Sequence, residues 1–268
     1  MIEDGRPSDG TRYDSIGLGY SQCRREDPVL YEKIIAALGS SQTVVNVGAG
    51  AGSYEPRDRT VLAVEPSEVM ARQRSCDKLP AIKATADRLP FHDKSVDACM
   101  TVLSLHHWNP NQMAGVHEMR RIARDRIVIV TIDPRISAQM WLMADYLPEV
   151  ADLDNRIFPL PETIGDWLGP ATEIEVIPTS RDTVDWSLVS FWAHPERVLN
   201  PAARGATSAF ARQSRAVVDR VVSHVARDLN SGLWDEKHGY LRGLNECDAG
   251  MRMITARLRP PRSQSRQP

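Results

Sequence analysis

The chain alternates short apolar runs with segments in which apolar residues recur every three or four positions. Runs of about four to eight β-branched residues are typical of strands buried on both faces, whereas the longer spacing is typical of helices with one buried face. Asp27-Pro28 predicts a helix start, because a capping side chain precedes proline at the first helical position, and Gly39 ends that helix. The expected strands are 43–47, 61–64, 81–84, 96–103, 126–132, 174–177 and 251–258; the further expected helices are 66–74, 109–122 (with Met113, Val116, Met119 and Ile122 buried), 136–150, 162–168 and 214–230.

Strands that alternate with helices in this way predict a doubly wound, Rossmann-like α/β fold with a mostly parallel, seven-stranded sheet. Ligands of such folds bind at the carboxyl ends of the strands. The alternation is interrupted after Asp133, where the chain becomes rich in aromatic residues and methionines. We expect this region to form an inserted helical lid subdomain.

A glycine-rich turn, Gly48-Ala49-Gly50-Ala51-Gly52, follows the first strand. Glycines reach positive φ without strain and leave backbone N–H groups open to close approach by a ligand. The second strand ends in Glu65, at the position where nucleotide-binding folds place a carboxylate for ribose hydroxyls. A dinucleotide fingerprint would need glycine where this chain has Ser53, which disfavours NAD. The two features predict a nucleoside site, although a plain tight turn would also explain the glycines alone.

Composition narrows the choice of partners. The net charge of −2 over 268 residues argues against nucleic acid, because such partners select a basic face, and basic residues gather only in the tail from Arg257. No run is long enough to span a membrane and the first eight residues do not resemble a signal peptide, so we expect no membrane partner and a cytoplasmic location. The scattered Cys23, Cys76, Cys99 and Cys247 predict neither a metal site nor disulfides.

Two further motifs follow the third and fourth strands: Ala86-Asp87-Arg88-Leu89-Pro90-Phe91 and Leu105-His106-His107-Trp108. With the glycine turn and Glu65, they make the region from about Leu38 to Asp133 resemble class I S-adenosylmethionine-dependent methyltransferases, in the small-molecule group that includes the ubiquinone-biosynthesis type (methyltransferase type 11). The resemblance implies S-adenosylmethionine as cofactor and a final strand that is antiparallel at the sheet edge. The implied cofactor contacts are Asn46, Gly48, Ala49, Gly50, Glu65, Pro66, Ala86, Asp87, Arg88, Leu103 and Ser104.

Within this resemblance the glycine turn would hold the methionine part of the cofactor, Glu65 the ribose and Asp87 the adenine amino group. The family usually has Asp or Glu at the position of Asn46, facing the cofactor's ammonium group. Asparagine keeps an acceptor oxygen but loses the charge, which would cost about 1 kcal/mol of binding, or about fivefold in affinity. The departure leaves the resemblance in place.

Aromatic residues provide candidates for closing the site. Tyr13 and Tyr20 stand in a polar N-terminal segment that the first helix would bring to the ligand end of the sheet. Because aromatic faces attract cations, we expect them to cover the cofactor's sulfonium. Trp108, Trp141 and Tyr146 are the expected acceptor contacts; core packing is the alternative explanation for each.

Methyl transfer from a sulfonium is an in-line displacement in which positioning can supply most of the rate enhancement. His106 and His107 are the candidate general bases, since histidine titrates near neutral pH; alternatively they form a pocket wall. We therefore expect methyl transfer to nitrogen, oxygen or carbon of a small molecule, in secondary metabolism. The alternative is a non-catalytic or regulatory protein that retains the cofactor fold, which Asn46 would favour; the oligomeric state stays open.

These expectations divide the chain into five parts. They are an N-terminal lid segment (1–26), a cofactor-binding core (27–135), substrate lid helices with the sixth strand (136–248), the final sheet strand (249–259) and a disordered tail (260–268).

Overall fold

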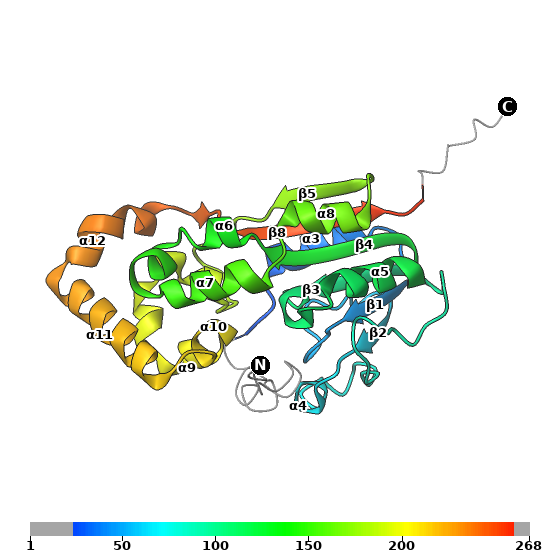
Figure 1. The fold of residues 1–268 in the computed structure, drawn as a ribbon, viewed down its shortest axis with the longest axis horizontal. Helices are drawn as coiled ribbons and strands as arrows, with labels where there is room; N and C mark the ends of the chain where they lie inside the picture. The colour runs from blue at the N-terminus through cyan, green and yellow to red at the C-terminus, as the bar shows by residue number, and fades with distance from the viewer. Residues whose placement is uncertain (1–23, 260–268) are drawn as a thin grey trace, which may run out of the picture.

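The computed structural model describes residues 24–259, so Tyr13, Tyr20 and the tail at 260–268 lie outside the described residues. A sheet with its covering helices occupies one end of the molecule, and a helical subdomain occupies the other (Figure 1). The strands are β1 (Thr43–Val47), β2 (Thr60–Val64), β3 (Val96–Val102), β4 (Ala123–Ile132), β5 (Thr172–Val176), β6 (Thr179–Ser180), β7 (Glu246–Cys247) and β8 (Met251–Arg257). The α-helices are α3 (Pro28–Leu38), α4 (Glu68–Ala71), α5 (Gln112–Ile122), α6 (Pro134–Ser137), α7 (Pro148–Ile157), α8 (Pro161–Leu168), α9 (Pro201–Gly205), α10 (Ser208–Ala211), α11 (Arg215–Ser231) and α12 (Leu233–His238). The 3₁₀-helices are η1 (Leu105–Trp108), η3 (Leu188–Ala193), η4 (Pro195–Leu199) and η5 (Gly239–Gly243), and η2 (Leu142–Tyr146) is a π-helix.

The central sheet of the described chain has six strands in the order β2-β1-β3-β4-β8-β5. The first four run parallel, and β8 pairs antiparallel with both β4 and β5. The chain leaves β1 toward β2 and returns on the other side of β1 to form β3, so the order reverses at β1. Such a reversal opens a crevice at the carboxyl ends of the strands, which is where ligands of doubly wound folds bind.

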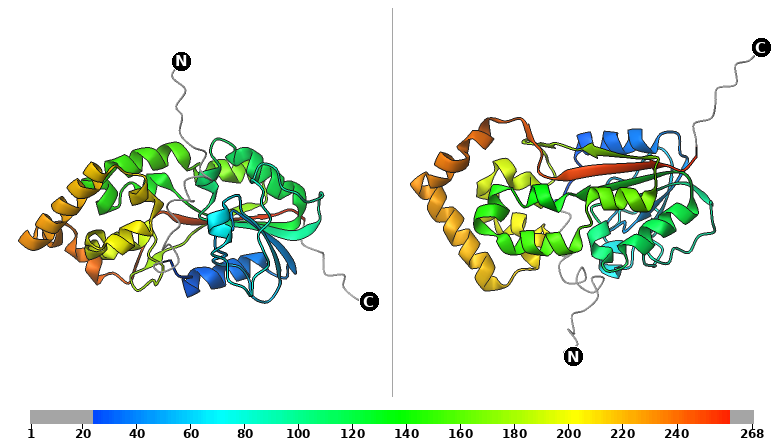
Figure 2. Two further views of the ribbon diagram at one scale, coloured as in Figure 1. Left: turned by 90° about the horizontal axis from the view of Figure 1, so that it is seen from below. Right: turned by 45° about the horizontal axis from the view of Figure 1, so that its top comes forward.

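Helices cover both faces of the sheet (Figure 2). The apolar stripe of α3 (Leu30, Ile34 and Leu38) packs on one face, and α5 and α8 pack on the other. α3 begins where the sequence predicts, since Asp27 accepts hydrogen bonds from the amides of Val29 and Leu30 and Pro28 occupies the first turn. The predicted doubly wound α/β class is confirmed.

Two expectations about the sheet are wrong. The strand expected at 81–84 is reduced to a single bridge between Ile82 and Val64, so the sheet formed by residues 24–259 has six strands and not seven. This segment lies beyond the edge strand β2, and Ile82 is itself exposed, so little apolar burial favours a longer ladder. The final strand, β8, is antiparallel as expected but lies inside the sheet, because β5 pairs along its outer side.

The helices also differ from expectation in places. The helix expected at 136–150 is three elements, α6, η2 and α7, because Pro148 has no N–H to continue a helix and instead begins α7. α5 starts at Gln112 and not at Asn109, and Met113 faces solvent with 51% of its surface exposed, whereas Val116, Met119 and Ile122 are buried. α4 ends at Ala71, short of the expected Arg74.

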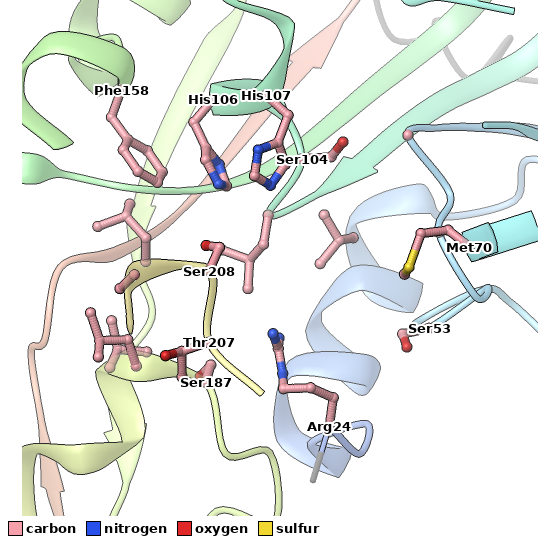
Figure 3. Close-up of a pocket in the computed structure, with 18 of the residues that line it drawn as sticks. Arg24, Ser53, Met70, Ser104, His106, His107, Phe158, Ser187, Thr207 and Ser208 are labelled. Carbon is pink, nitrogen blue, oxygen red and sulfur yellow. The ribbon is translucent and has the colours of Figure 1, made fainter. Parts of the chain in front are cut away.

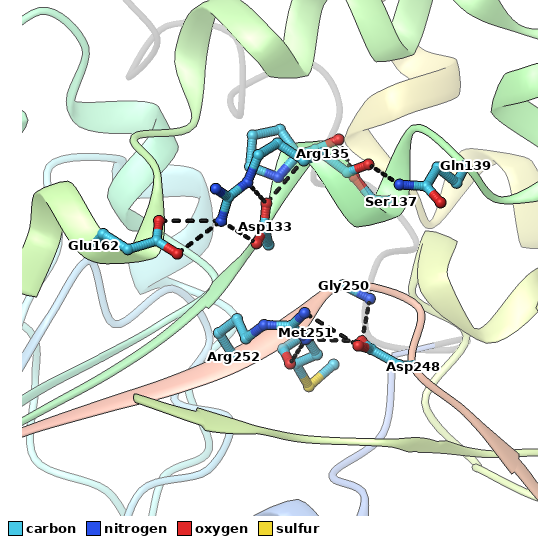
Figure 4. A network of polar contacts seen from close by, with 10 residues as sticks. Asp133, Arg135, Ser137, Gln139, Glu162, Asp248, Gly250, Met251 and Arg252 are labelled. Atoms are coloured by element: carbon cyan, nitrogen blue, oxygen red, sulfur yellow. Dashed lines mark hydrogen bonds and ion pairs between the residues drawn. The ribbon is translucent and has the colours of Figure 1, made fainter. Parts of the chain in front are cut away.

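The helical subdomain has its own apolar centre around Phe191, Trp192 and Trp234. The chain leaves the sheet at Asp133 and returns at Gly250, and these two crossings are joined by a hydrogen bond of 2.7 Å from the Asp133 amide to the Gly250 carbonyl. Polar pairs surround this junction (Figure 4): Arg135 bridges Asp133 and Glu162, while Arg252 pairs with Asp248. The junction fixes the subdomain against the carboxyl ends of the strands. None of the helices in the described part of the chain is long and apolar enough to cross a membrane.

Candidate active site

A cavity lies where the carboxyl ends of β1, β2 and β3 meet the helical subdomain. The sheet side contributes the glycine turn, the end of β2 and η1. The subdomain side contributes the end of α7 and the segments 187–189 and 207–212. Figure 3 shows His106, His107 and Phe158 together on one side of this cavity, with Arg24 reaching in from the opposite side and Met70 toward one end.

The glycine turn and Glu65 form one hydrogen-bonded unit. Glu65 is buried, and its carboxylate accepts from the Gly50 amide at 2.7 Å and from the Ser67 amide at 2.8 Å. Gly48 has a φ of 68°, and a Cβ there would lie 1.9 Å from the Ser104 hydroxyl oxygen. Glycine at 48 is therefore required both by the backbone conformation and by the space available.

Asn46 lines the cavity and has an unused acceptor. Its amide nitrogen donates to Glu55 at 3.1 Å, and Glu55 is held in turn by both terminal nitrogens of Arg74. The buried Oδ1 of Asn46 has no hydrogen-bond partner among the described residues. A buried acceptor without a partner costs about 1–3 kcal/mol, so this position favours a ligand that donates a hydrogen bond.

The two adjacent histidines lie in different surroundings. His106 is buried and stacks on Phe158 with 4.1 Å between ring centroids, and desolvation, aided by His107 and Arg212, lowers its pKa well below the ordinary value, so it stays neutral. The Nδ1 of His107 lies 3.1 Å from a terminal nitrogen of Arg212. Because a guanidinium can only donate, Nδ1 accepts and the ring proton of a neutral His107 is on Nε2. The lone pair that a base would use is therefore already occupied.

Many of the sequence-predicted residues come together at this cavity. Asn46, Gly48, Ala49, Gly50, Glu65, Pro66, Leu103, Ser104, His106, His107 and Trp108 all line it. Ala86, Asp87 and Arg88 do not; Asp87 accepts instead from the Asn111 side chain at 3.0 Å, and its adenine contact stays a prediction.

Trp141 and Tyr146 do not line the cavity, so their contact with the acceptor stays a prediction. Both side chains are buried in the subdomain core, where Trp141 donates to the Trp192 carbonyl and Tyr146 donates to Asp228. These positions favour core packing, the alternative explanation for both aromatics.

Sequence reasoning missed several lining residues. Asp154, Ile157 and Phe158 come from the end of α7, which the expected helix at 136–150 did not reach. Arg24 lines the cavity and forms an ion pair of 2.5 Å with Asp185, which joins the start of the described chain to the subdomain. Met70, Ser187 and Arg212 also line the cavity, and the sequence around each of them does not distinguish it from an ordinary core or surface residue.

A family model described as a methyltransferase domain matches residues 45–130. A crystal structure from Anabaena variabilis, of a candidate methyltransferase from an antibiotic biosynthesis pathway, is 30% identical; the match covers 88% of this chain and 99% of that one, with a TM-score of 0.81. This chain belongs to the S-adenosylmethionine-dependent methyltransferases. Comparison with curated proteins finds no match.

Two more distant methyltransferase structures share the fold. A Haemonchus contortus phosphoethanolamine N-methyltransferase is 12% identical, with 95% of this chain and 61% of that chain covered and a TM-score of 0.58. A candidate histamine N-methyltransferase from Thermotoga maritima is 13% identical, with 93% and 96% covered and a TM-score of 0.51. The cofactor of this methyltransferase is S-adenosylmethionine, and its site suits that molecule: the unpartnered Asn46 oxygen can accept from an ammonium group, and Gly48 leaves the close approach that a Cβ would fill.

Proposed function

We propose that this methyltransferase transfers the methyl group of S-adenosylmethionine to a nitrogen, oxygen or carbon of a small molecule in secondary metabolism. The observation that carries the proposal is a single cavity lined both by the glycine turn and by the helical subdomain. One cavity of this kind can hold the methyl donor and the methyl acceptor in contact. This matters because the correct placement of the two reactants is the largest requirement of a displacement reaction. The antibiotic-pathway description of the Anabaena variabilis relative supports the assignment to secondary metabolism.

At the cofactor end, we assign the methionine part to the glycine turn, the ammonium group to Asn46 Oδ1 and the ribose hydroxyls to Glu65. Glu65 suits this role because two backbone amides already orient its carboxylate. Asp87 is the proposed partner of the adenine amino group. The bound cofactor supplies an electrophilic methyl group on a sulfonium, and the chain's part is to orient it and exclude water.

At the other end, the acceptor would meet a mostly apolar wall with few polar groups. Leu153, Ile157 and Phe158 come from α7, Leu188 and Val189 from η3, and Thr207, Ser208 and Arg212 from the region of α10. Apolar walls with a small number of polar groups are typical of sites for organic molecules of modest size. The helical subdomain is accordingly the proposed acceptor-recognition part of the chain.

The experiment is a methyl-transfer screen. The full chain is incubated with S-adenosylmethionine and pooled metabolites, and products are detected by a mass increase of one methylene unit. A Gly50→Val variant, in which a side chain enters the turn, serves as the control without cofactor binding. The proposal expects at least one product that requires the wild-type chain; a wild type that binds cofactor and methylates nothing from broad pools would contradict it.

A further inference from the structure

The C-terminal end of α7 places a carboxylate in the acceptor half of the cavity. Phe158 stacks on His106, and the Gln112 side chain donates to the Ile157 carbonyl at 3.0 Å, so this end of α7 is attached to η1 and α5. Asp154 lies one helical turn before Phe158 and therefore on the same side of α7. Both residues line the cavity.

Asp154 differs from Glu65 and Asp185, the other carboxylates that line the cavity, in having no partner among the described residues. Glu65 accepts from two backbone amides, and Asp185 is paired with Arg24. The Asp154 carboxylate has neither a hydrogen bond nor an ion pair with any residue between 24 and 259. A half-buried carboxylate without a partner is costly to keep unless something in the working site uses it.

The electrostatics around Asp154 set its protonation near neutral pH. Burial raises the pKa of its carboxyl to about 7, and the nearby positive charge of Arg212 acts in the opposite direction. Other titratable and charged groups also line the cavity: His106 is neutral, His107 is held by Arg212, Arg24 is paired with Asp185, and Glu65 accepts from two backbone amides. Arg25 and Tyr54 complete this set among the described residues. A group that titrates near the working pH is the best suited to accept a proton during turnover.

We propose that Asp154 is the catalytic residue that accepts the acceptor's proton, and that the methylated atom is consequently an O–H oxygen or an N–H nitrogen. This inference rests on the proposed function. The lone pair of that atom forms the bond to the methyl carbon, and the methyl–sulfur bond breaks with its electron pair left on sulfur. The proton of the O–H or N–H group passes to a carboxylate oxygen of Asp154.

The histidines are poorer candidates for the same task. His107 would have to give up its hydrogen bond from Arg212 before Nδ1 could take a proton. His106 would have to become charged in a buried position where desolvation opposes it. They are better suited to shaping the wall beside the reacting atoms, and His107 can donate from Nε2.

The first test measures the protonation of Asp154 in the full chain saturated with S-adenosylhomocysteine. Aspartate carboxyl carbons are labelled with ¹³C, and the signal that disappears in Asp154→Asn identifies the residue. Asp152→Asn, which changes an exposed carboxylate on the same helix, is the matched control. A midpoint near pH 7 is expected; a midpoint near the ordinary aspartate value of about 4 would overturn the proposal.

The second test measures turnover with the acceptor that the wild-type chain methylates in the pooled screen. Asp154→Asn should lower kcat at least about 100-fold and leave the Kd for S-adenosylhomocysteine unchanged, whereas Asp152→Asn should behave as wild type. Wild-type kcat should rise with pH through about 7, because only the ionised carboxylate accepts a proton, and this rise should be missing in Asp154→Asn. Two results would contradict this inference alone: a product methylated on carbon, on a tertiary amine or on a thioether, and an Asp154→Asn variant that keeps more than a tenth of the wild-type turnover. If the wild-type chain forms no product at all, the proposed function and this inference are both contradicted.

Discussion

The two ends of the cavity are built in different ways. The cofactor end consists of strand termini and a glycine turn whose groups are close in sequence and joined by hydrogen bonds, as Gly50, Glu65 and Ser67 are. The acceptor end brings together α7, η3 and the region of α10, which are far apart in the chain and meet through the tertiary fold. The cofactor end is formed by residues close in sequence, which suits a ligand that is the same in every methyltransferase of this kind. The residues of the acceptor end can be substituted to suit a different acceptor without altering the sheet.

Of the substitutions that test this difference between the two ends, Gly48→Ala is expected to cause the largest loss of cofactor affinity. Gly48→Ala forces a Cβ to within 1.9 Å of the Ser104 hydroxyl at a φ of 68°, so the turn must move. The Kd for S-adenosylhomocysteine should rise at least about 100-fold, equivalent to about 2.8 kcal/mol, in a chain that remains folded by circular dichroism. Gly205→Ala, where a Cβ would meet nothing within 4 Å, is the control. Normal binding by Gly48→Ala would remove the glycine turn from the site.

Glu65→Ala should have the next largest effect. Loss of charge-assisted hydrogen bonds to the ribose would weaken S-adenosylhomocysteine by about 1–3 kcal/mol, or roughly 5- to 150-fold in Kd, measured by calorimetry. Glu68→Ala, which changes an exposed carboxylate three residues later, should bind normally. An unchanged Kd for Glu65→Ala would exclude Glu65 from the ribose contact.

Removal of residues 1–22 tests the expectation that Tyr13 and Tyr20 cover the sulfonium. The truncated chain keeps Arg24 and its ion pair with Asp185, so the comparison isolates the preceding segment. S-adenosylmethionine should bind about 0.5–2 kcal/mol more weakly, which is the range of a cation–π contact. S-adenosylhomocysteine, which has no sulfonium charge, should lose less affinity; equal affinities in both chains would mean that the tyrosines are not part of the site.

His107→Ala should have the smallest effect. Because its Nδ1 accepts from Arg212, we expect kcat to fall by less than about tenfold with little change in cofactor affinity. His117→Ala, at an exposed position on α5, is the control. A fall of about 100-fold or more would return the proton-accepting role to His107 and argue against Asp154.

The comparison also explains what could be predicted from the sequence. Gly48, Gly50 and Glu65 were predictable because Gly48 and Glu65 stand directly after strands, Gly50 lies in the turn that follows β1, and the carboxyl ends of parallel strands meet at one edge. Asp154 was not predictable, because Asp152 and Asp154 look alike in sequence and only the packing of α7 against η1 brings one of them to the cavity. The same limit applies to Trp141 and Tyr146, whose chemistry suited a ligand contact but whose positions are in the subdomain core.

The most direct test of the two-ended cavity is a crystal structure of the full chain with S-adenosylhomocysteine. We expect the ribose hydroxyls within hydrogen-bonding distance of Glu65, the amino group near Asn46 Oδ1, and the sulfur directed toward the space beside His106, Phe158 and Asp154. A ligand bound outside this cavity, or a sulfur directed away from the end of α7, would contradict the account.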